Sequence, residues 1–162
     1  MRKPLLPLLL IVSLFIFSCS STKKSTGSGT VASTAADNDG NPTLKKPSAK
    51  MLDENTYQLE GVSEDPTYAY DQKNAVKVGG VGSGPTNERR YLNALLGPNG
   101  ESITYSRLGS CCPTPSKNGL MGSAILDIYE IKYAGLEKPI QIYINMYDPG
   151  ILKAPKGFNY KK

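Results

Sequence analysis

Two stretches near the C-terminus, AILDIYEIKY at residues 124–133 and IQIYINMY at residues 140–147, decide the fold. Both are rich in β-branched and aromatic residues, and only residues 134–139, which include a Gly and a Pro, separate them. In the second stretch isoleucines alternate with polar or aromatic residues, which is typical of a strand with one buried face. In the first, Asp127 alone interrupts an apolar face. The pattern predicts an antiparallel hairpin that covers a core.

The residues before this hairpin predict one helix and further strands. Residues 75–81 form a short apolar stretch, and Pro85, which follows a run of glycines, suits the first turn of a helix. Gly97 and the Pro after it end the helical pattern, and residues 102–108 read as extended. We therefore expect an α+β domain with one main helix and a small antiparallel sheet of three or four strands. The predicted helix has one face made of Glu88, Tyr91, Leu92 and Leu95.

Composition divides the chain of 162 residues into three parts. Residues 1–18 are an apolar leader, and residues 66–162 contain the predicted strands and helix. Residues 19–65 are rich in small polar residues and lack the apolar side chains that would offset their chain entropy, so we expect a disordered, flexible tether. The domain carries twelve Lys or Arg against seven Asp or Glu. This charge favours anionic partners, although the basic residues are scattered, which is also typical of a solvated surface.

The N-terminus has the three parts of a secretory signal. Two basic residues precede an apolar core at residues 5–17, and Ile-Phe-Ser-Cys follows at residues 16–19. The core is shorter than the roughly twenty apolar residues of a membrane span. The junction resembles the lipobox of bacterial lipoproteins, which implies that residues 1–18 are a lipoprotein signal peptide and that Cys19 carries diacylglycerol and an N-acyl chain such as palmitate. An ordinary secreted protein, cleaved near Ser18, is the alternative.

The residues after Cys19 indicate where the lipid holds the protein. Two or more acyl chains anchor a protein stably, whereas one binds only marginally. The residue after Cys19 is Ser20, whereas an Asp at this position would resemble an inner-membrane retention signal. No acidic cluster that resembles a surface-export signal follows either. We expect a cell-envelope protein anchored in the outer membrane through Cys19 and facing the periplasm. Besides the membrane, the expected partner is an envelope protein or a glycan. A nucleic acid is not expected as a partner.

Catalytic residues are not evident in the sequence. Histidine is absent, which removes the commonest general base and every Ser-His-Asp or Cys-His arrangement. Asp127 and Glu130 fall on opposite faces of a strand, so they do not converge on one bond. We therefore expect a binding or structural domain with no metal and no cofactor, rather than an enzyme. A periplasmic enzyme or a binder of sugar phosphates is the alternative.

The glycine run before the predicted helix could bind an anion, because backbone N–H groups at a helix start attract negative charge. Two arginines follow within the first turns. The run matches neither the P-loop, which has Lys after its last Gly, nor G-x-G-x-x-G. A flexible or bulged strand exit is the alternative. The candidate anion-binding residues are Gly80, Gly82, Gly84, Arg89 and Arg90.

Cys111 and Cys112 are adjacent and are the only thiols left once Cys19 is lipidated. In an oxidising compartment they could form a vicinal disulfide, remain as thiols packed in the core, or act in redox chemistry or ligand binding. Neighbouring Cα atoms are about 3.8 Å apart, closer than the roughly 4.4–6.8 Å of ordinary disulfides, so such a bridge would be strained and easy to reduce. Pro113 favours an extended Cys112, and residues 109–115 read as a tight loop.

Tyrosine is frequent, with ten residues and no tryptophan. In a hairpin these side chains either pack against one face of the sheet or stack on a glycan. The tyrosines in the predicted hairpin are Tyr129, Tyr133, Tyr143 and Tyr147.

Four stretches are distinctive together: AVKVGG at 75–80, NERRYL at 87–92, LGSCCP at 108–113 and YINMYD at 143–148. They resemble a group of short lipoproteins from Bacteroidota whose role is undefined, and the resemblance covers about residues 70–158. Some members are named 2-dehydro-3-deoxyphosphooctonate aldolase. That enzyme resembles a TIM barrel, which needs about 200 residues or more, and the domain here has fewer than half as many. The resemblance therefore implies lineage and a lipoprotein address rather than a reaction.

Overall fold

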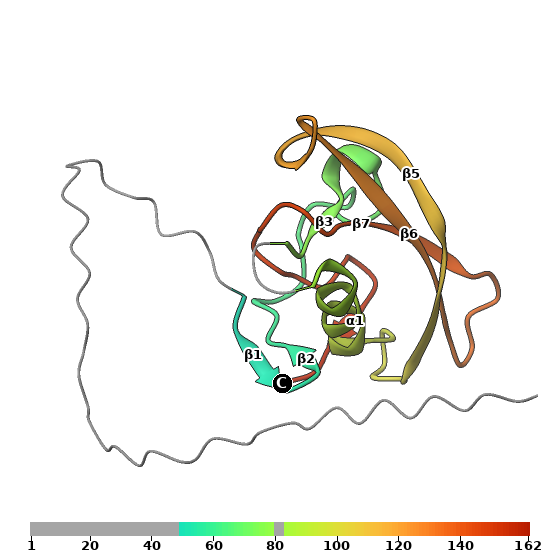
Figure 1. Cartoon of the computed structure of the whole chain (residues 1–162). Coiled ribbons are helices and arrows are strands. Elements are labelled where there is room, and N and C mark those ends of the chain that lie inside the picture. Colours follow the sequence, from blue (N-terminus) through green and yellow to red (C-terminus); the bar gives the residue numbers. More distant parts are fainter. Residues whose placement is uncertain (1–48, 80–82) are drawn as a thin grey trace, which may run out of the picture. The chain divides into compact units, whose positions relative to one another are not determined.

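The computed structural model describes residues 49–79 and 83–162, and in this part the chain is mostly β with one main helix (Figure 1). The signal peptide, Cys19, the expected tether as far as residue 48, and Gly80 and Gly82 lie outside the described residues. The elements are β1 (Met51–Asp53), β2 (Thr56–Tyr57), a 3-10 helix (Gln72–Asn74), β3 (Val76–Lys77), α1 (Gly84–Ala94), β4 (Leu95–Leu96), β5 (Ile103–Leu120), β6 (Ser123–Tyr133), β7 (Ile140–Asn145) and β8 (Asn159–Tyr160).

The main sheet has four strands in the order β3-β7-β6-β5. The β5–β6 and β6–β7 pairs are antiparallel, as predicted, but β3 runs parallel to β7, with Val76 opposite Ile144. The expected antiparallel sheet is therefore a mixed one. The helix and the β5–β6 hairpin lie between β3 and β7 along the chain, and a crossover of this length allows parallel pairing. Two small antiparallel sheets, β1-β2 and β4-β8, complete the domain.

The hairpin predicted from residues 124–133 and 140–147 is present as β6 and β7. Its inner face and one face of α1 share a single core. Fully burying a side chain of this size contributes about 1.5–3 kcal/mol, so the alternation in the sequence is sufficient to orient the sheet. The fully buried core side chains on these elements are Tyr91, Leu92, Ile131, Ile142 and Ile144.

β5 is longer than predicted, because it continues to Leu120 through residues 109–115, which were expected to form a tight loop. Within the described sheet β5 is an edge strand, and an edge accepts prolines since alternate N–H groups need no partner there. The end of β5 near the β5–β6 turn is attached to the rest of the domain by Asp148. Its Oδ1 accepts hydrogen bonds from Ser116 Oγ at 2.7 Å and Asn118 Nδ2 at 2.8 Å. Figure 1 shows β5 and β6 as two long, twisted strands, and they pair with each other along most of their length.

The tether was expected to end at residue 65, but the folded domain begins earlier in the chain. Tyr57 and Leu59 are both buried in the core. Backbone hydrogen bonds join this segment to the C-terminal region, including Glu60 N to Leu152 O and Ser63 N to Ala154 O, both 2.8 Å. Composition averaged over residues 19–65 conceals these few apolar side chains. No helix in the described part is long and apolar enough to cross a membrane.

Candidate functional site

A cluster of polar side chains, of which Glu88, Asp127 and Tyr129 are buried, lies where α1 packs on β5 and β6. Glu88 of α1 is 0% exposed, and its Oε2 accepts a 2.9 Å hydrogen bond from the Tyr129 hydroxyl. Asp127, which is 2% exposed, accepts hydrogen bonds from Arg107 Nε at 2.7 Å and Nη2 at 2.8 Å. Ser110 Oγ donates to the same carboxylate at 2.6 Å. The polar cluster, made of Glu88, Arg107, Ser110, Asp127 and Tyr129, links the helix to the sheet.

Local structure explains why these side chains meet. Glu88 shares its helix face with core residues such as Tyr91, which lies one turn further along. The alternation of β6 places Asp127, Tyr129 and Ile131 on one face of the strand. A bulge in β5 between Arg107 and Gly109 then brings Ser110 opposite Asp127. Two acids on apolar faces thus converge beneath one arginine.

The pKa values of the two carboxyl groups, Glu88 and Asp127, are shifted in opposite directions. Burial and the negative charge of Asp127 raise the pKa of Glu88 to about 7. Burial also opposes ionisation of Asp127, but the hydrogen bonds from Arg107 and Ser110 outweigh it and lower its pKa. Among the described residues, Glu88 Oε1 is a buried atom without a hydrogen-bond partner. Near pH 7 the cluster therefore contains a carboxyl group that is about half protonated beside one that is ionised.

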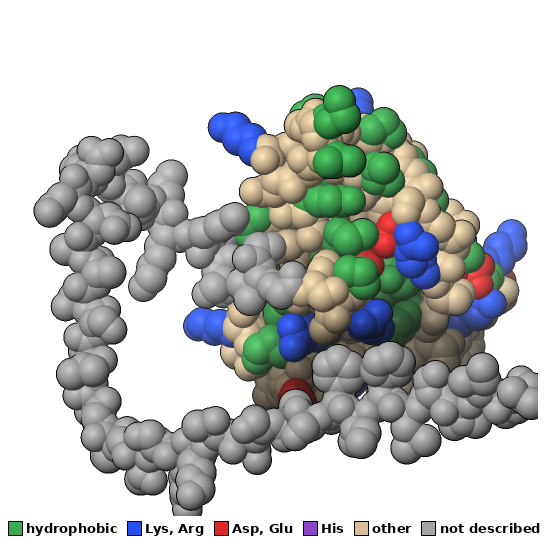
Figure 2. All heavy atoms as spheres, in the orientation of Figure 1, with side chains coloured by type: hydrophobic (Ala, Val, Ile, Leu, Met, Phe, Trp, Pro, Cys, Tyr) green, Lys and Arg blue, Asp and Glu red, His purple; other side chains and the backbone are tan. Residues whose placement is uncertain are grey.

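A pocket of about 470 Å³ opens above this cluster. Its volume falls in the range of small-molecule sites, which is about 300–1,000 Å³. The guanidinium groups of Arg89 and Arg107 could hold an anion, and Tyr105 and Met146 supply apolar surface. Figure 2 shows hydrophobic side chains on this face with acidic and basic side chains beside them. The lining residues are Pro85, Glu88, Arg89, Tyr105, Arg107, Asp127, Tyr129 and Met146.

Of the expected anion-binding residues, Gly80 and Gly82 lie outside the described part of the chain, and the two arginines lie on different sides of α1. Arg89 Nη2 donates to Thr86 Oγ1 at 3.2 Å, and Arg89 lines the pocket. Arg90 instead donates to Asn87 Oδ1 at 3.3 Å and lies close to Tyr57, on another side of the helix. Consecutive helical residues are about 100° apart around the axis, which separates the two arginines. Arg107 of β5, rather than Arg90, accompanies Arg89.

Gly84, the first residue of α1, has a packing role. A Cβ atom at this position would lie 2.6 Å from the Met146 sulfur, so only glycine lets the helix start this close to the end of β7.

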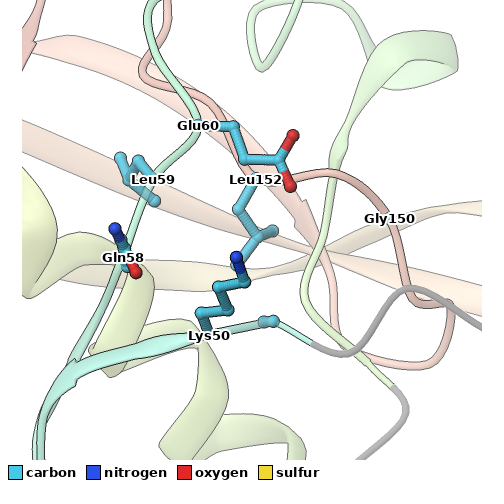
Figure 3. Close-up of a pocket in the computed structure, with 7 residues that line it drawn as sticks. Lys50, Gln58, Leu59, Glu60, Gly150 and Leu152 are labelled. Carbon is cyan, nitrogen blue, oxygen red and sulfur yellow. The ribbon is translucent and has the colours of Figure 1, made fainter.

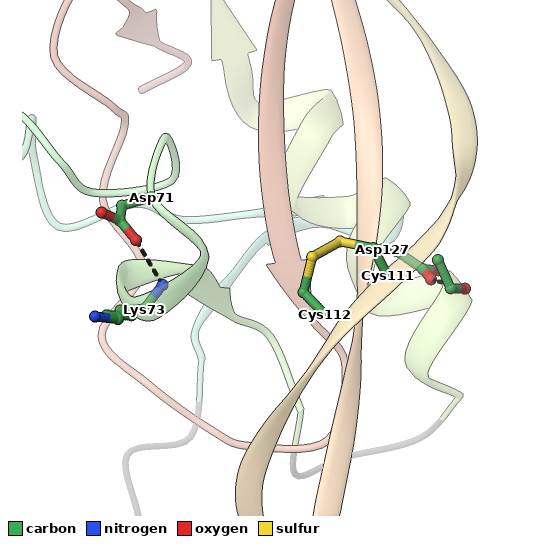
Figure 4. The surroundings of a disulfide bond; sticks show 6 residues. Asp71, Lys73, Cys111, Cys112 and Asp127 are labelled. Atoms are coloured by element: carbon green, nitrogen blue, oxygen red, sulfur yellow. Dashed lines mark hydrogen bonds between the residues drawn. A yellow bond between two sulfur atoms is a disulfide. The ribbon is translucent and has the colours of Figure 1, made fainter.

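Cys111 and Cys112 are joined as a vicinal disulfide, with an S–S distance of 2.08 Å (Figure 4). Both residues are half-buried rather than packed in the core. Cys112 has φ +57°, so the expectation that Pro113 keeps it extended is wrong. The bulge between Cys111 and Pro113 takes Cys112 out of register with β6, and there it adopts the left-handed conformation.

A second hollow lies beside β2, with a volume of about 130 Å³. Figure 3 shows Lys50, Glu60 and Leu152 together around it. This volume lies below the range of about 300–1,000 Å³ that is typical of small-molecule sites. Among the described residues, no group of three or more Cys, Asp or Glu side chains is arranged to hold a metal ion.

Comparison with known proteins finds no matching family model, no similar curated protein and no matching solved structure. The geometry of the polar cluster is therefore the main guide to the candidate site. Sequence reasoning missed its members Glu88, Arg107, Ser110, Asp127 and Tyr129. Two signals were present, namely an acid on the apolar face of the predicted helix and another interrupting the apolar face of the predicted strand.

Proposed function

We propose that this protein is a lipid-anchored cell-envelope protein whose folded domain binds a partner or ligand. The observation that carries the proposal is the apolar leader that ends in Ile-Phe-Ser-Cys at residues 16–19, followed by a polar stretch before the folded domain. The described domain adds a pocket above the polar cluster, which supports binding. The same reasoning favours the outer membrane, because Ser20 rather than Asp follows Cys19.

Replacement of the lipidated cysteine tests the anchor. Cys19→Ala is expected to move the protein from the membrane fraction to the soluble periplasmic fraction, because without the thiol no diacylglycerol can be attached. The measurement is fractionation together with labelling by radioactive palmitate, with Ser18→Ala as the matched control, since a small residue before the Cys is retained. A Cys19→Ala variant that stays on the membrane and still takes up palmitate contradicts the proposal.

The second candidate function is binding of a small anion, such as a phosphorylated sugar, in the pocket above the polar cluster. Two guanidinium groups on its rim favour this function, and one of them, Arg107, is 47% exposed. Asp127 balances the charge of Arg107, and Glu88, with a pKa of about 7, is mostly protonated below that pH, so Arg89 leaves the lining with a net positive charge on the acidic side of pH 7. Anions are attracted to such a lining.

The two neighbouring arginines of α1 give a matched test of anion binding. Arg89→Gln is expected to weaken binding of inorganic phosphate or a sugar phosphate by about tenfold, since a hydrogen bond to a charged group contributes about 1.5–3 kcal/mol. Arg90→Gln, on the side of Tyr57, is expected to leave binding unchanged. Binding is measured by calorimetry, and thermal stabilisation by each anion is a second readout. Equal losses in both variants, or no binding by the unmodified chain, would exclude this second function.

A further inference from the structure

Ser110 and Cys111 lie between two bulges in β5. The pairing with β6 skips Leu108, so that Gly109 stands opposite Ile128 and Ser110 opposite Asp127. It then continues to Cys111, opposite Leu126, and skips Cys112. Each bulge inserts one extra residue into β5. The first bulge therefore reverses which side chains of β5 point to a given face of the sheet, and the second bulge reverses this again.

The register of this short segment decides whether Asp127 receives a hydroxyl group. Because side chains alternate between the faces of a strand, a slip by one residue would turn Ser110 away and bring Gly109 or Cys111 opposite the carboxylate. Neither residue has an oxygen-bearing side chain to replace Ser110 Oγ, which donates at 2.6 Å. Arg107 Nη2 also donates to Ser110 Oγ, so a slip would alter the hydrogen bonds of the arginine as well.

The disulfide lies at the bulge that closes this segment. Cys112 is held at φ +57°, a left-handed conformation that is unfavourable for a non-glycine residue. The bond to Cys111 ties Cys112 to its neighbour, and half-burial leaves the bridge within reach of a thiol. Without the bond, this covalent constraint on Cys112 is lost, and the extended conformation that a following proline favours becomes accessible.

We propose that Cys111–Cys112 is a site of thiol–disulfide exchange with a dithiol reductant, and that its redox state sets the register of Ser110 against Asp127. A thiolate of the reductant attacks one sulfur, the S–S bond breaks, and the other sulfur leaves as a thiolate that takes up a proton. The second thiol of the reductant then resolves the mixed disulfide. The protein gains two electrons and two protons, and the reductant becomes a disulfide.

The carboxylate of Asp127 reports this change. It faces Glu88 from α1, Arg107 and Ser110 from β5, and Tyr129 from its own strand. Loss of the hydrogen bond from Ser110 removes one of the interactions that lower the pKa of Asp127. Reduction is therefore expected to raise the titration midpoint of Asp127 by about one pH unit, as for one hydrogen bond to a charged group.

The experiment uses the mature chain with Cys19→Ala, so that Cys111 and Cys112 are its only thiols. The side-chain carboxyl of Asp127 is titrated by NMR before and after reduction with dithiothreitol. Ser110→Ala is expected to have the raised midpoint already and to show no further shift. Ser106→Ala, an exposed serine on the same strand, is the matched control and should respond as the unmodified chain does. An unchanged midpoint on reduction, or a full response in Ser110→Ala, would overturn the proposal.

A second pair of variants covers the case in which the reduced chain unfolds. Cys111→Ala combined with Cys112→Gly allows a left-handed residue at the bulge without the disulfide, because glycine adopts positive φ at little cost. It should titrate like the oxidised chain. Cys111→Ala combined with Cys112→Ala should titrate like the reduced chain. Identical midpoints in the two variants would show that the conformation of residue 112 does not control Ser110.

Discussion

At pH 8, Glu88→Gln is expected to stabilise the folded domain by about 2–3 kcal/mol, and at pH 4 the same change should have little effect. In the folded protein the pKa of Glu88 is about 7, raised from 4.5 by burial and by the charge of Asp127. The folded state therefore binds the proton more tightly than the unfolded state. The stabilisation from this carboxyl is complete below about pH 4.5 and is lost as the pH rises through 7, at about 1.36 kcal/mol per unit.

Glutamine keeps the shape of the protonated side chain and has no charge to bury. Its carbonyl can accept the hydrogen bond from the Tyr129 hydroxyl, which now goes to Glu88 Oε2. Urea unfolding of both proteins at pH 4, 6 and 8 gives the difference in free energy of unfolding. Glu130→Gln, which removes a carboxylate from a surface ion pair with Lys132, is the control and should differ little across this range. A difference between wild type and Glu88→Gln that is constant from pH 4 to 8 contradicts the prediction.

The sequence was sufficient for the parts of the fold that follow from local pattern. The β6–β7 hairpin and α1 were predicted because alternation with period two and helical spacing both appear over several consecutive residues. The parallel pairing of β3 with β7 was not predictable, because it rests on two residue pairs and a long crossover. The extent of β5 was concealed by Pro113 and Pro115, which the sheet accepts because β5 is an edge strand.

The candidate site illustrates the same division between local pattern and tertiary contact. Glu88 and Asp127 each stood out as an acid on an apolar face, yet no single-sequence pattern states which helix face meets which strand. The contribution of Ser110 depended on the bulge that skips Leu108, and only the neighbouring Gly109, with φ +152°, indicated an irregular strand. In the sequence Asp127 could be related to Glu130, which lies on the same strand. Its partner in the fold is Glu88 of α1, which no pattern along the strand indicates.

Arg107→Met is expected to destabilise the domain by about 2–3 kcal/mol at neutral pH. The change removes the charged partner of the buried Asp127 carboxylate, which keeps the hydrogen bond from Ser110 and lies beside the Glu88 carboxyl. Removing one partner of a fully buried ion pair costs about 3–5 kcal/mol. Arg107 is 47% exposed, and solvent screening reduces this cost.

The effect of Arg107→Met should depend on pH in the direction opposite to that of Glu88→Gln. The pKa of Asp127 is lowered in the folded protein, so its ion pair contributes stability above the unfolded pKa of about 3.8 and loses it as the pH falls. The cost of Arg107→Met is therefore expected to be largest at pH 7 and to shrink below pH 4. Lys132→Met is the matched control, because it removes the lysine of the Glu130 ion pair on the sheet surface, which contributes about 0–1 kcal/mol. A cycle with Asp127→Asn isolates the coupling, and equal costs for Arg107→Met in the presence and absence of the Asp127 charge would show that the arginine acts by packing alone.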